Sequence, residues 1–551
     1  MKTRCAVWIA IAASSISALA QNYPGAPDGN GLTPKTSTIY VNSQGTDSTT
    51  INNGNSEAIG VAIAGNGNVI VGWEDDNNDY PTIDLESAWT MYNSSGVQVT
   101  TNQTLTSVND SSITLDTRFL SLFRSDGSGV YDGTSWGPKI KANLFGGGVG
   151  MGCSSFFISD EVSEFADYDT SMTGDLPVVQ LLSNAGQPSG ILAGASVAYA
   201  TRDGDIWIAD WDYLSDGNIL IMAESHQFDD LVSVYGGATD AVHAFFRILA
   251  PDGTVVKNET LVSSTVEQVQ MWHGVGVVNG GFAARFATSS GDKVRLFKND
   301  GTPITTNINL ATVTGLPMAG TGGQGENTGF HGNGLNAYVV ANAGLDAAGS
   351  PAVCVTVLNT NGTVRYSKSV VDDITLLSAD SADAAINTNG EVIVVFTGTY
   401  YDNPNTVMGR KLDASGNTTN GTFYVSENEY PKSGSGAASY PRVAWRDGKV
   451  AISWVSTSDP GSIAIDGSRL KVAALRLFST STNDIPTTAR PTLSAKVSGK
   501  NITLSWDASA TGFTLVSTTN ISSNTIWTTV GTQNPTTEAM GTEKKFYRLV
   551  K

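Results

Sequence analysis

A short unit of strand, glycine turn and strand recurs along this chain and constrains its fold more than any other feature. The clearest copy spans residues 407–425, VMGRKLDASGNTTNGTFYV. Asn-Gly and Asp-Gly steps supply the positive φ angles that a tight hairpin needs, so each copy is expected to form a β-hairpin. The turn glycines of the six copies are Gly96, Gly186, Gly253, Gly301, Gly362 and Gly416.

A second hairpin precedes most of these copies. Its turns are short runs of Gly, Asn and Asp, and each is followed by an apolar run such as VIVGW at 69–73 or VIVVF at 392–396. Two hairpins make four antiparallel strands, and a repeat of about 40–60 residues with four strands is typical of a β-propeller blade. We therefore expect an all-β chain whose main part is a seven-bladed β-propeller. A pair of β-sandwiches is the alternative, but sandwiches do not repeat two hairpins in register.

The seventh copy is incomplete, and the N-terminal region contains a candidate for the missing strand. Residues 470–478, LKVAALRLF, have neither the glycine turn nor the second strand. Residues 37–42, STIYVN, resemble the fourth strand TFYVS at 422–426. We expect this N-terminal strand to complete the last blade, so that the propeller occupies residues 21–484.

The two ends of the chain have a different character. Residues 1–20 have the basic start, short apolar core and Ala-x-Ala end of a signal peptide, which predicts a secreted or cell-surface protein. The apolar run is too short to span a membrane. Residues 485–491 contain two prolines and are expected to be a linker, and residues 492–551 alternate as the short strands of a separate β-module do.

Charge is distributed unevenly along the chain. The net charge is −19, yet residues 490–551 contain seven Lys or Arg and three acidic residues. An acidic body without a basic stripe has poor affinity for phosphates, which argues against a nucleic-acid partner. The sequence also lacks a glycine-rich phosphate loop and a nucleophile motif.

The basic C-terminal region carries a resemblance to a known module. Its segments GKNITLSWDASATGFTLVSTTN at 499–520, WTTV at 527–530 and KFYRL at 545–549 resemble a C-terminal β-module of exported proteins in Verrucomicrobia and related bacteria. The resemblance covers about 60 residues and implies sorting or attachment to the cell envelope. A small sandwich that only stabilises the C-terminus is the alternative.

Ligands of propellers usually bind where the loops between second and third strands, and the connections between blades, open around the centre of the ring. The repeat alignment places acidic and aromatic side chains there. Aromatic faces stack on sugar rings, so this face is expected to bind a polysaccharide. The predicted substrate-binding residues are Glu74, Asp75, Glu224, Trp272, Tyr400, Tyr401, Tyr440 and Arg442.

Three of the four histidines, His226, His243 and His273, map to the same rim, and Arg285 is near them in sequence. A histidine suits proton transfer near neutral pH, and an arginine could neutralise the carboxylate of a uronic-acid polymer. These four residues are the predicted catalytic group of a polysaccharide lyase. For each histidine, a hydrogen-bonded structural role is the alternative. His331 adjoins a first-hairpin turn and is predicted to lie on the opposite face.

Hydrolysis needs two carboxylates across one sugar, and Glu74 or Asp75 could pair with Glu224 only across non-adjacent blades. The acidic run 74–79 does not have the spacing of an EF-hand loop, so no metal or other cofactor is predicted, with calcium left open. The sequence thus predicts an exported propeller that engages an extracellular polysaccharide, as a lyase ahead of a glycoside hydrolase. A non-catalytic glycan-binding or adhesion propeller is the alternative.

Overall fold

The structure is a computed structural model, and its described elements are all β-strands. The chain divides into two compact units, Met1–Asp484 and Ile485–Lys551. The structure describes residues 32–42, 59–77, 84–104, 130–132, 139–158, 174–193, 206–225, 243–264, 269–288, 290–310, 329–400, 403–419, 421–426, 438–459, 470–480, 493–506, 514–519, 527–539, 541 and 545–550.

The described strands of the first unit form seven small antiparallel sheets, which we number in chain order. Sheet 1 contains β3 (Ile59–Ile63), β4 (Val69–Asn77), β5 (Asp84–Tyr92) and β6 (Gln103–Thr104). Sheet 2 contains β7 (Val130–Asp132), β8 (Lys139–Ala142), β9 (Val149–Ile158), β10 (Gly174–Leu182) and β11 (Pro188–Ala193). Sheet 3 contains β12 (Ile206–Tyr213), β13 (Ile219–Ser225), β14 (His243–Leu249) and β15 (Val255–Leu261).

The remaining four sheets repeat the same order of strands. Sheet 4 contains β16 (Val269–Val278), β17 (Gly281–Thr288), β18 (Gly291–Lys298) and β19 (Ile308–Asn309). Sheet 5 contains β20 (Phe330–Gly332), β21 (Ala337–Leu345), β22 (Pro351–Asn359) and β23 (Val364–Ser369). Sheet 6 contains β24 (Ser378–Ile386), β25 (Val392–Tyr400), β26 (Asn403–Leu412) and β27 (Phe423–Tyr424). Sheet 7 contains β28 (Ala438–Arg446), β29 (Lys449–Ser456) and β30 (Val472–Thr480), with β1 (Leu32–Pro34) and β2 (Ile39–Tyr40) on its outer edge.

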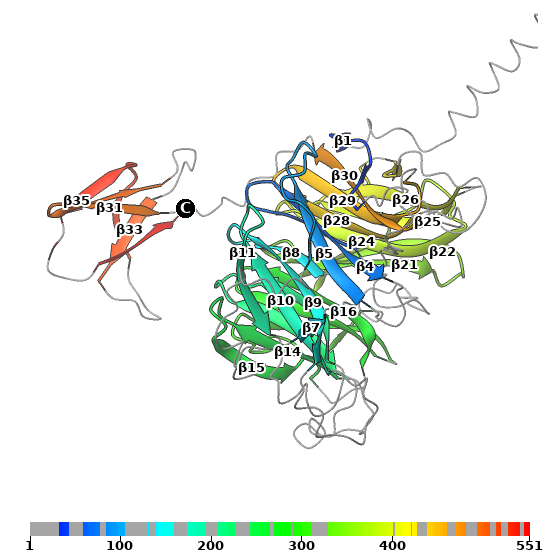
Figure 1. Cartoon of the computed structure of the whole chain (residues 1–551), viewed down its shortest axis with the longest axis horizontal. Coiled ribbons are helices and arrows are strands. Elements are labelled where there is room, and N and C mark those ends of the chain that lie inside the picture. Colours follow the sequence, from blue (N-terminus) through cyan, green and yellow to red (C-terminus); the bar gives the residue numbers. More distant parts are fainter. Residues whose placement is uncertain are drawn as a thin grey trace, which may run out of the picture. The chain divides into compact units, whose positions relative to one another are not determined.

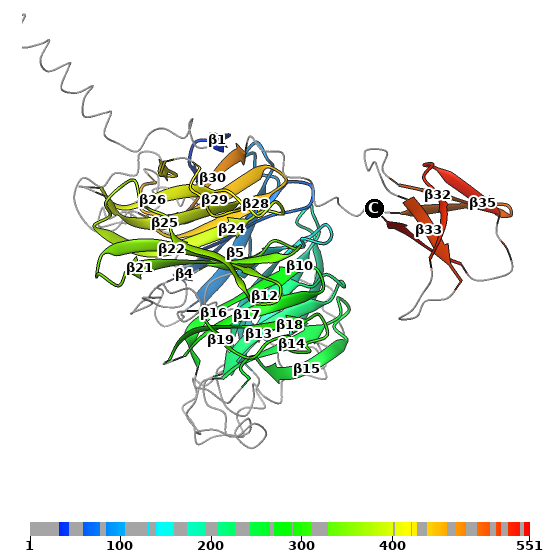
Figure 2. The same ribbon diagram turned by 180° about the vertical axis from the view of Figure 1, so that it is seen from behind.

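The first strands of the seven sheets contact one another in a closed cycle. The order of contacts is β3, β8, β12, β16, β20, β24, β28 and back to β3. Figures 1 and 2 show the sheets following one another in chain order, from blue β5 through green β14 to yellow β25 and orange β30. A ring of four-stranded antiparallel sheets with their first strands innermost is the architecture of a β-propeller.

The six predicted hairpin glycines all adopt positive φ angles, between 75° and 83°. The turn at Gly416 illustrates the reason, since its N–H donates to the carbonyl of Asp413 and the Asp413 carboxylate accepts the N–H of Asn417. A residue with a Cβ would be strained in this conformation. The turn chemistry of the sequence is therefore confirmed at each of the six positions.

Sheet 2 has a first hairpin that the sequence pattern did not reveal. It joins β8 to β9 through a longer, glycine-rich turn, closed by the N–H of Asn143 donating to the carbonyl of Gly148 at 3.0 Å. Its six-residue turn, 143–148, is one residue longer than the first-hairpin turns of sheets 1, 3 and 6. This hairpin supplies the innermost strand of sheet 2, and with it Lys141.

The N-terminal strands lie on the last sheet. β1 and β2 both pair antiparallel with β30, with Leu32 opposite Thr480 and Ile39 opposite Leu475. Backbone hydrogen bonds from Lys35 to Leu477, just after β1, and from Val41 to Ala473, just after β2, extend the pairing. Blue β1 lies beside orange β30 in both views (Figures 1 and 2).

The core lies between neighbouring sheets. Each large hydrophobic cluster of the ring combines buried residues from two consecutive sheets, as with Phe246, Phe282 and Phe297 between sheets 3 and 4. The rings of Phe282 and Phe297 stack at 5.0 Å between centroids. Trp73 and Trp454, which the pattern places in strands, are buried in the cluster between sheets 7 and 1 and in that between sheets 6 and 7 respectively. No sheet could bury both of its faces alone, so the ring is the unit of stability.

The second unit contains two three-stranded sheets around a small core of Leu504, Trp506 and Leu515. Their strands are β31 (Ser494–Ser498), β32 (Asn501–Ser505), β33 (Thr514–Thr518), β34 (Thr528–Gly531), β35 (Thr536–Ala539) and β36 (Phe546–Val550). No described segment is a helix of the length and hydropathy that crossing a bilayer requires.

Candidate functional site

Ionisable side chains meet at the centre of the ring, on the first strands of the sheets. In five sheets the first hairpin closes with a backbone hydrogen bond, whose donors are Ala64, Asn143, Leu214, Asn333 and Asn387. The residue two places before each donor occupies an equivalent position on its strand. These residues are Ala62, Lys141, Asp212, His331 and Ala385. Alanine suffices at this position in two sheets, whereas three sheets carry an ionisable group there.

Asp210 links three consecutive sheets. Its Oδ2 accepts a hydrogen bond from Lys141 Nζ of sheet 2 at 2.8 Å and from the backbone N–H of Val275 of sheet 4 at 2.7 Å. Asp210 and Lys141 are both buried. Burial would lower the pKa of Lys141, but Asp210 and Asp212 outweigh it and raise that pKa, so the lysine stays charged.

Asp383 links sheets 5, 6 and 7 in the same way. Its Oδ1 lies 2.8 Å from Nε2 of His331 in sheet 5, and its Oδ2 accepts the N–H of Val443 in sheet 7 at 2.9 Å. Both aspartates stand four residues before the donor that closes their hairpin, Leu214 or Asn387. Each therefore binds a basic side chain from the sheet before and a backbone N–H from the sheet after.

Glycine allows the first strands to approach this closely. A Cβ on Gly329 would overlap the carboxylate of Asp383, and a Cβ on Gly332 would overlap the backbone of Val277 in sheet 4. Both glycines flank His331 on β20 or immediately before it. The local backbone therefore fixes where the His331 imidazole can lie.

Asp212 links no two sheets within the part of the chain that the structure describes. Its Oδ1 accepts a local hydrogen bond from the N–H of the next residue, Tyr213, at 2.8 Å. The side chain is buried, with 6% of the residue exposed. Burial raises the pKa of Asp212 to about 7; the Lys141 charge opposes the rise and Asp210 adds to it. Its carboxyl group can therefore give or take a proton near neutral pH.

We call Lys141, Asp210, Asp212, His331 and Asp383 the central cluster. The members act on one another electrostatically: His331 influences the pKa of Asp212, and Asp383 influences that of Lys141. The His331 side chain is 33% exposed, whereas that of Asp383 is 1% exposed. The cluster thus combines an ammonium group, a carboxyl group that titrates near pH 7 and a partly accessible imidazole. Such a set is suited to hydrogen bonding and to proton transfer.

Metal binding finds no support at this centre. No group of three or more His, Cys, Asp or Glu side chains within the described ranges is arranged to hold an ion. The backbone of the acidic run at Glu74 and Asp75 lies in β4, and its side chains are outside the described residues. The calcium alternative at this run therefore stays untested.

Several residues expected at the substrate face lie on strands, with only their backbone described. These are Glu74 and Asp75 in β4, Trp272 and His273 in β16, and Tyr400 at the end of β25. His226 and Tyr401 lie outside the described residues.

Glu224 and His243 occupy strands rather than loops. Glu224 lies in β13 opposite Ala244, and His243 begins β14 opposite Ser225. Both are buried, with 4% and 3% of their surfaces exposed. Strand alternation turns them to opposite faces of sheet 3. The second strand is longer than the sequence suggested, so the expected loop carboxylate is a buried strand residue.

Arg285 and His243 face different neighbours. Arg285 is buried in β17, 2.5 Å from Asp292 and 3.1 Å from Asn342 of sheet 5. His243 shares its strand face with Leu249, which packs in the cluster of sheets 2 and 3. The described residues therefore do not bring the arginine to this histidine, because Arg285 is held between sheets 4 and 5.

Tyr440 and Arg442 both lie in β28 and are half-buried. Tyr440 packs against the cluster between sheets 7 and 1 and has a φ of 51°. Arg442 is near enough to the centre to lower the pKa of Asp383. Arg442, which the sequence predicts to bind substrate, therefore lies beside the central cluster.

Comparison with known proteins gives a weak likeness only. No family model matches the chain, and no curated protein matches it. A protein of unknown function from Dyadobacter fermentans DSM 18053 is 10% identical over 82% of this chain and 99% of its own, with a TM-score of 0.42.

Two further solved structures are similar to the same degree. The endosialidase of phage phi92 is 11% identical over 86% of this chain and 73% of its own, with a TM-score of 0.41. The Dos1 propeller is 10% identical over 82% and 97%, with a TM-score of 0.37. With TM-scores below 0.5, these likenesses support no inference about function, and the fold rests on the strand pairing described above.

Proposed function

We propose that this protein is an exported, seven-bladed β-propeller that engages an extracellular polysaccharide at the centre of its ring. The C-terminal unit, Ile485–Lys551, would attach it to the cell envelope. The sequence supports export through its signal-peptide pattern and disfavours nucleic acid through its acidic charge. The observation that supports the proposed binding site at the centre is the burial of Asp212.

Asp212 is a buried carboxyl group that makes no hydrogen bond between sheets within the described residues. The equivalent residue of sheet 6 is Ala385, and Asp210 already provides the link between sheets at this point. Burying a carboxylate is unfavourable unless it is paired, so its presence favours a role toward a ligand. A carboxyl and an ammonium group side by side suit the hydroxyl and carboxylate groups of a glycan.

Cleavage of that glycan is the second candidate, and the pKa of Asp212 favours it. A group with a pKa of about 7 can serve as a general acid or base at neutral pH. In β-elimination the base would take the C5 proton next to the uronate carboxylate, while Lys141 or Arg442 would neutralise that carboxylate. A C4–C5 double bond would form as the bond from C4 to the glycosidic oxygen breaks, and the protonated base would return its proton to that leaving oxygen. Asp212 and Lys141 replace His243 and Arg285 as the pair that we propose for this chemistry.

The test is a screen of the full chain against immobilised neutral and acidic polysaccharides. Retention is measured on each polymer, with absorbance of unsaturated uronates and release of reducing ends followed in parallel. We expect retention on at least one polymer and a loss of affinity in Asp212→Asn, which preserves shape and removes the titrating group. Asp216→Asn is the matched control, because Asp216 is an exposed turn residue of the same sheet.

Each result separates the candidates. Uronate absorbance that falls by about a hundredfold or more in Asp212→Asn would make the protein a lyase with Asp212 in proton transfer. Retention without either product favours the binding protein. Failure of the wild-type chain to bind any polymer would refute the proposed function.

A further inference from the structure

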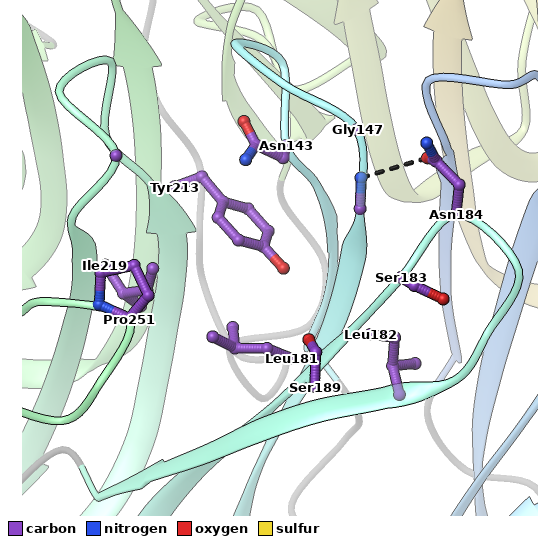
Figure 3. A pocket seen from close by; sticks show the side chains of 12 residues that line it. Asn143, Gly147, Leu181, Leu182, Ser183, Asn184, Ser189, Tyr213, Ile219 and Pro251 are labelled. Carbon is purple, nitrogen blue, oxygen red and sulfur yellow. Dashed lines mark hydrogen bonds between the residues drawn. The ribbon is translucent and has the colours of Figure 1, made fainter. Parts of the chain in front are cut away.

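A crevice between sheets 2 and 3 opens at the hairpin-turn end of the strands. Its volume is about 400 Å³, within the range of about 300–1,000 Å³ that is usual for small-molecule sites. On the side of sheet 2 its walls are the β8–β9 turn, β10, the β10–β11 turn and β11. On the side of sheet 3 they are the first hairpin and the turn between β14 and β15. Figure 3 shows the Tyr213 ring in the middle, between Asn143 and Leu181.

The apolar part of the crevice is rigid. The Tyr213 hydroxyl donates to the carbonyl of Val149 at 2.7 Å, and the ring packs edge-on against Trp211 at 5.1 Å between centroids. Leu181, Ile219 and Pro251 extend this surface on either side of the ring (Figure 3). A ligand would therefore meet a preformed apolar wall and lose little free energy in ordering it.

Two asparagines line the crevice and use their amide oxygens as acceptors for backbone N–H groups. Asn184 Oδ1 accepts the backbone N–H groups of Gly65 and Gly148, each at 3.1 Å, which leaves Nδ2 as the free end of the amide. Asn143 Oδ1 likewise accepts the N–H of Phe145 at 3.0 Å. Within the described residues, no acceptor is bonded to either Nδ2 group. The exposed hydroxyl of Ser189 adds a third polar group at the edge of the crevice.

None of the described residues that line the crevice has a charged side chain. Its twelve lining residues are glycines, aliphatic residues, serines, asparagines, one proline and one tyrosine. Burial raises the pKa of that tyrosine, Tyr213, so it remains neutral. An acidic or basic ligand would lose hydration here without gaining a partner charge, whereas a neutral ligand would not.

We infer that this crevice binds a neutral sugar unit. A pyranose has apolar C–H faces, which match the tyrosine ring and its aliphatic neighbours, and a rim of hydroxyl oxygens, which match the amide donors. The choice of a sugar rests on the proposed function, but the site is separate from the central cluster. Tyr213 and Asp212 are adjacent in β12, and strand alternation directs them to opposite faces.

The experiment measures binding of neutral mono- and disaccharides of glucose, galactose, mannose and xylose to the full chain. Saturation-transfer NMR detects binding and calorimetry gives the affinity. Asn184→Asp retains the oxygen that holds Gly65 and Gly148 but removes both amide donors. Ser189→Trp fills the crevice from an exposed position. Its control is Val256→Trp, three residues after the turn glycine Gly253, as Ser189 follows Gly186, and Val256 is 48% exposed.

We expect at least a tenfold loss of affinity in Asn184→Asp and in Ser189→Trp, no loss in Val256→Trp, and unchanged melting temperatures. The inference is overturned if the wild-type chain binds none of these sugars, or if both crevice variants bind them as it does. Polymer retention that is lost in Asp212→Asn, together with unchanged free-sugar affinity in both crevice variants, would overturn only the crevice site. Binding of free sugars without retention on any polymer would instead overturn the proposed function.

Discussion

Asp212 and Asp383 are buried aspartates of the same cluster, yet their pKa values move in opposite directions. Burial raises that of Asp212 to about 7. Burial alone would also raise the pKa of Asp383, but the His331 charge and hydrogen bond, Arg442 and the N–H of Val443 outweigh it and lower the pKa. Asp383 is thus a charged carboxylate that links sheets 5, 6 and 7. Asp212 is instead a carboxyl group whose charged form is disfavoured by burial.

Asp212→Asn should therefore stabilise the protein at alkaline pH. Because the folded pKa is raised, the favourable contribution of the protonated group is fully present below the unfolded value of 3.8 and is gone above about 7. The free energy of unfolding should fall by about 1.4 kcal/mol per pH unit between these values in the wild type. Urea unfolding at pH 5 and pH 8 measures the slope. An equal slope in Asp212→Asn would contradict this assignment.

Asp383→Asn should destabilise the protein at neutral pH by about 3 kcal/mol, since it leaves His331 and Val443 without their carboxylate. The folded pKa is lowered, so the contribution is present above the unfolded value of 3.8 and is lost as the pH falls through the folded value. Urea unfolding at pH 7 measures the loss. Asp372→Asn is the control, because Asp372 is an exposed partner of Arg410 at 2.8 Å and should matter by less than about 1 kcal/mol.

Among the strands, β1 and β2 can be removed to test whether they stabilise sheet 7. Leu32 is buried against sheet 7, and Thr36 and Asn42 accept the backbone N–H groups of Leu477 and Ala473 through their side chains. Deleting residues 21–45 should lower the free energy of unfolding by about 4 kcal/mol, from several hydrogen bonds and one buried leucine.

A shorter deletion provides the comparison. Removing residues 21–31 takes away chain that precedes β1 and should leave the melting temperature unchanged. Calorimetry of both truncated proteins checks the pair. Equal melting temperatures for the longer deletion and the full chain would show that β1 and β2 do not hold sheet 7.

For the whole molecule, the two compact units should unfold independently. The division lies between Asp484 and Ile485. A protein of residues 21–484 should therefore keep the main thermal transition of the full chain within about a degree, and the small second transition should disappear. A large drop in the main transition would mean that the C-terminal unit supports the ring.

The repeating strands and turns of the whole chain could be predicted because each depends on neighbours in sequence. Turn glycines such as Gly253 and Gly416 carry their own signal, and the structure confirms their positive φ angles. The central cluster could not be found in this way. Lys141, Asp210 and His331 come from three sheets, and their meeting depends on how the ring closes.

A partial signal for the cluster does exist in the sequence. Ionisable residues stand two or four places before the donor that closes the first hairpin at Asp210, Asp212, His331 and Asp383, whereas sheet 1 has Gly60 and Ala62 at these positions. The first-hairpin turn of sheet 2 is longer than the others, so the sequence pattern did not predict β8 and its residue Lys141. The prediction for Arg285 failed for a related reason, because proximity in sequence did not place it beside His243.

The pairing of β1 and β2 with β30 also sets an order on assembly. The ribosome makes these strands first, yet their partner ends at Thr480, near the end of the first unit. Before β30 is made, the strands of the first six sheets can pair with one another. β1 and β2 cannot pair until then, because their partner strand is β30. Contacts between residues so distant in sequence form slowly, because the chain between them must first be ordered. Sheet 7 is therefore completed only when the first strands of the chain, β1 and β2, pair with β30, the last strand of the first unit.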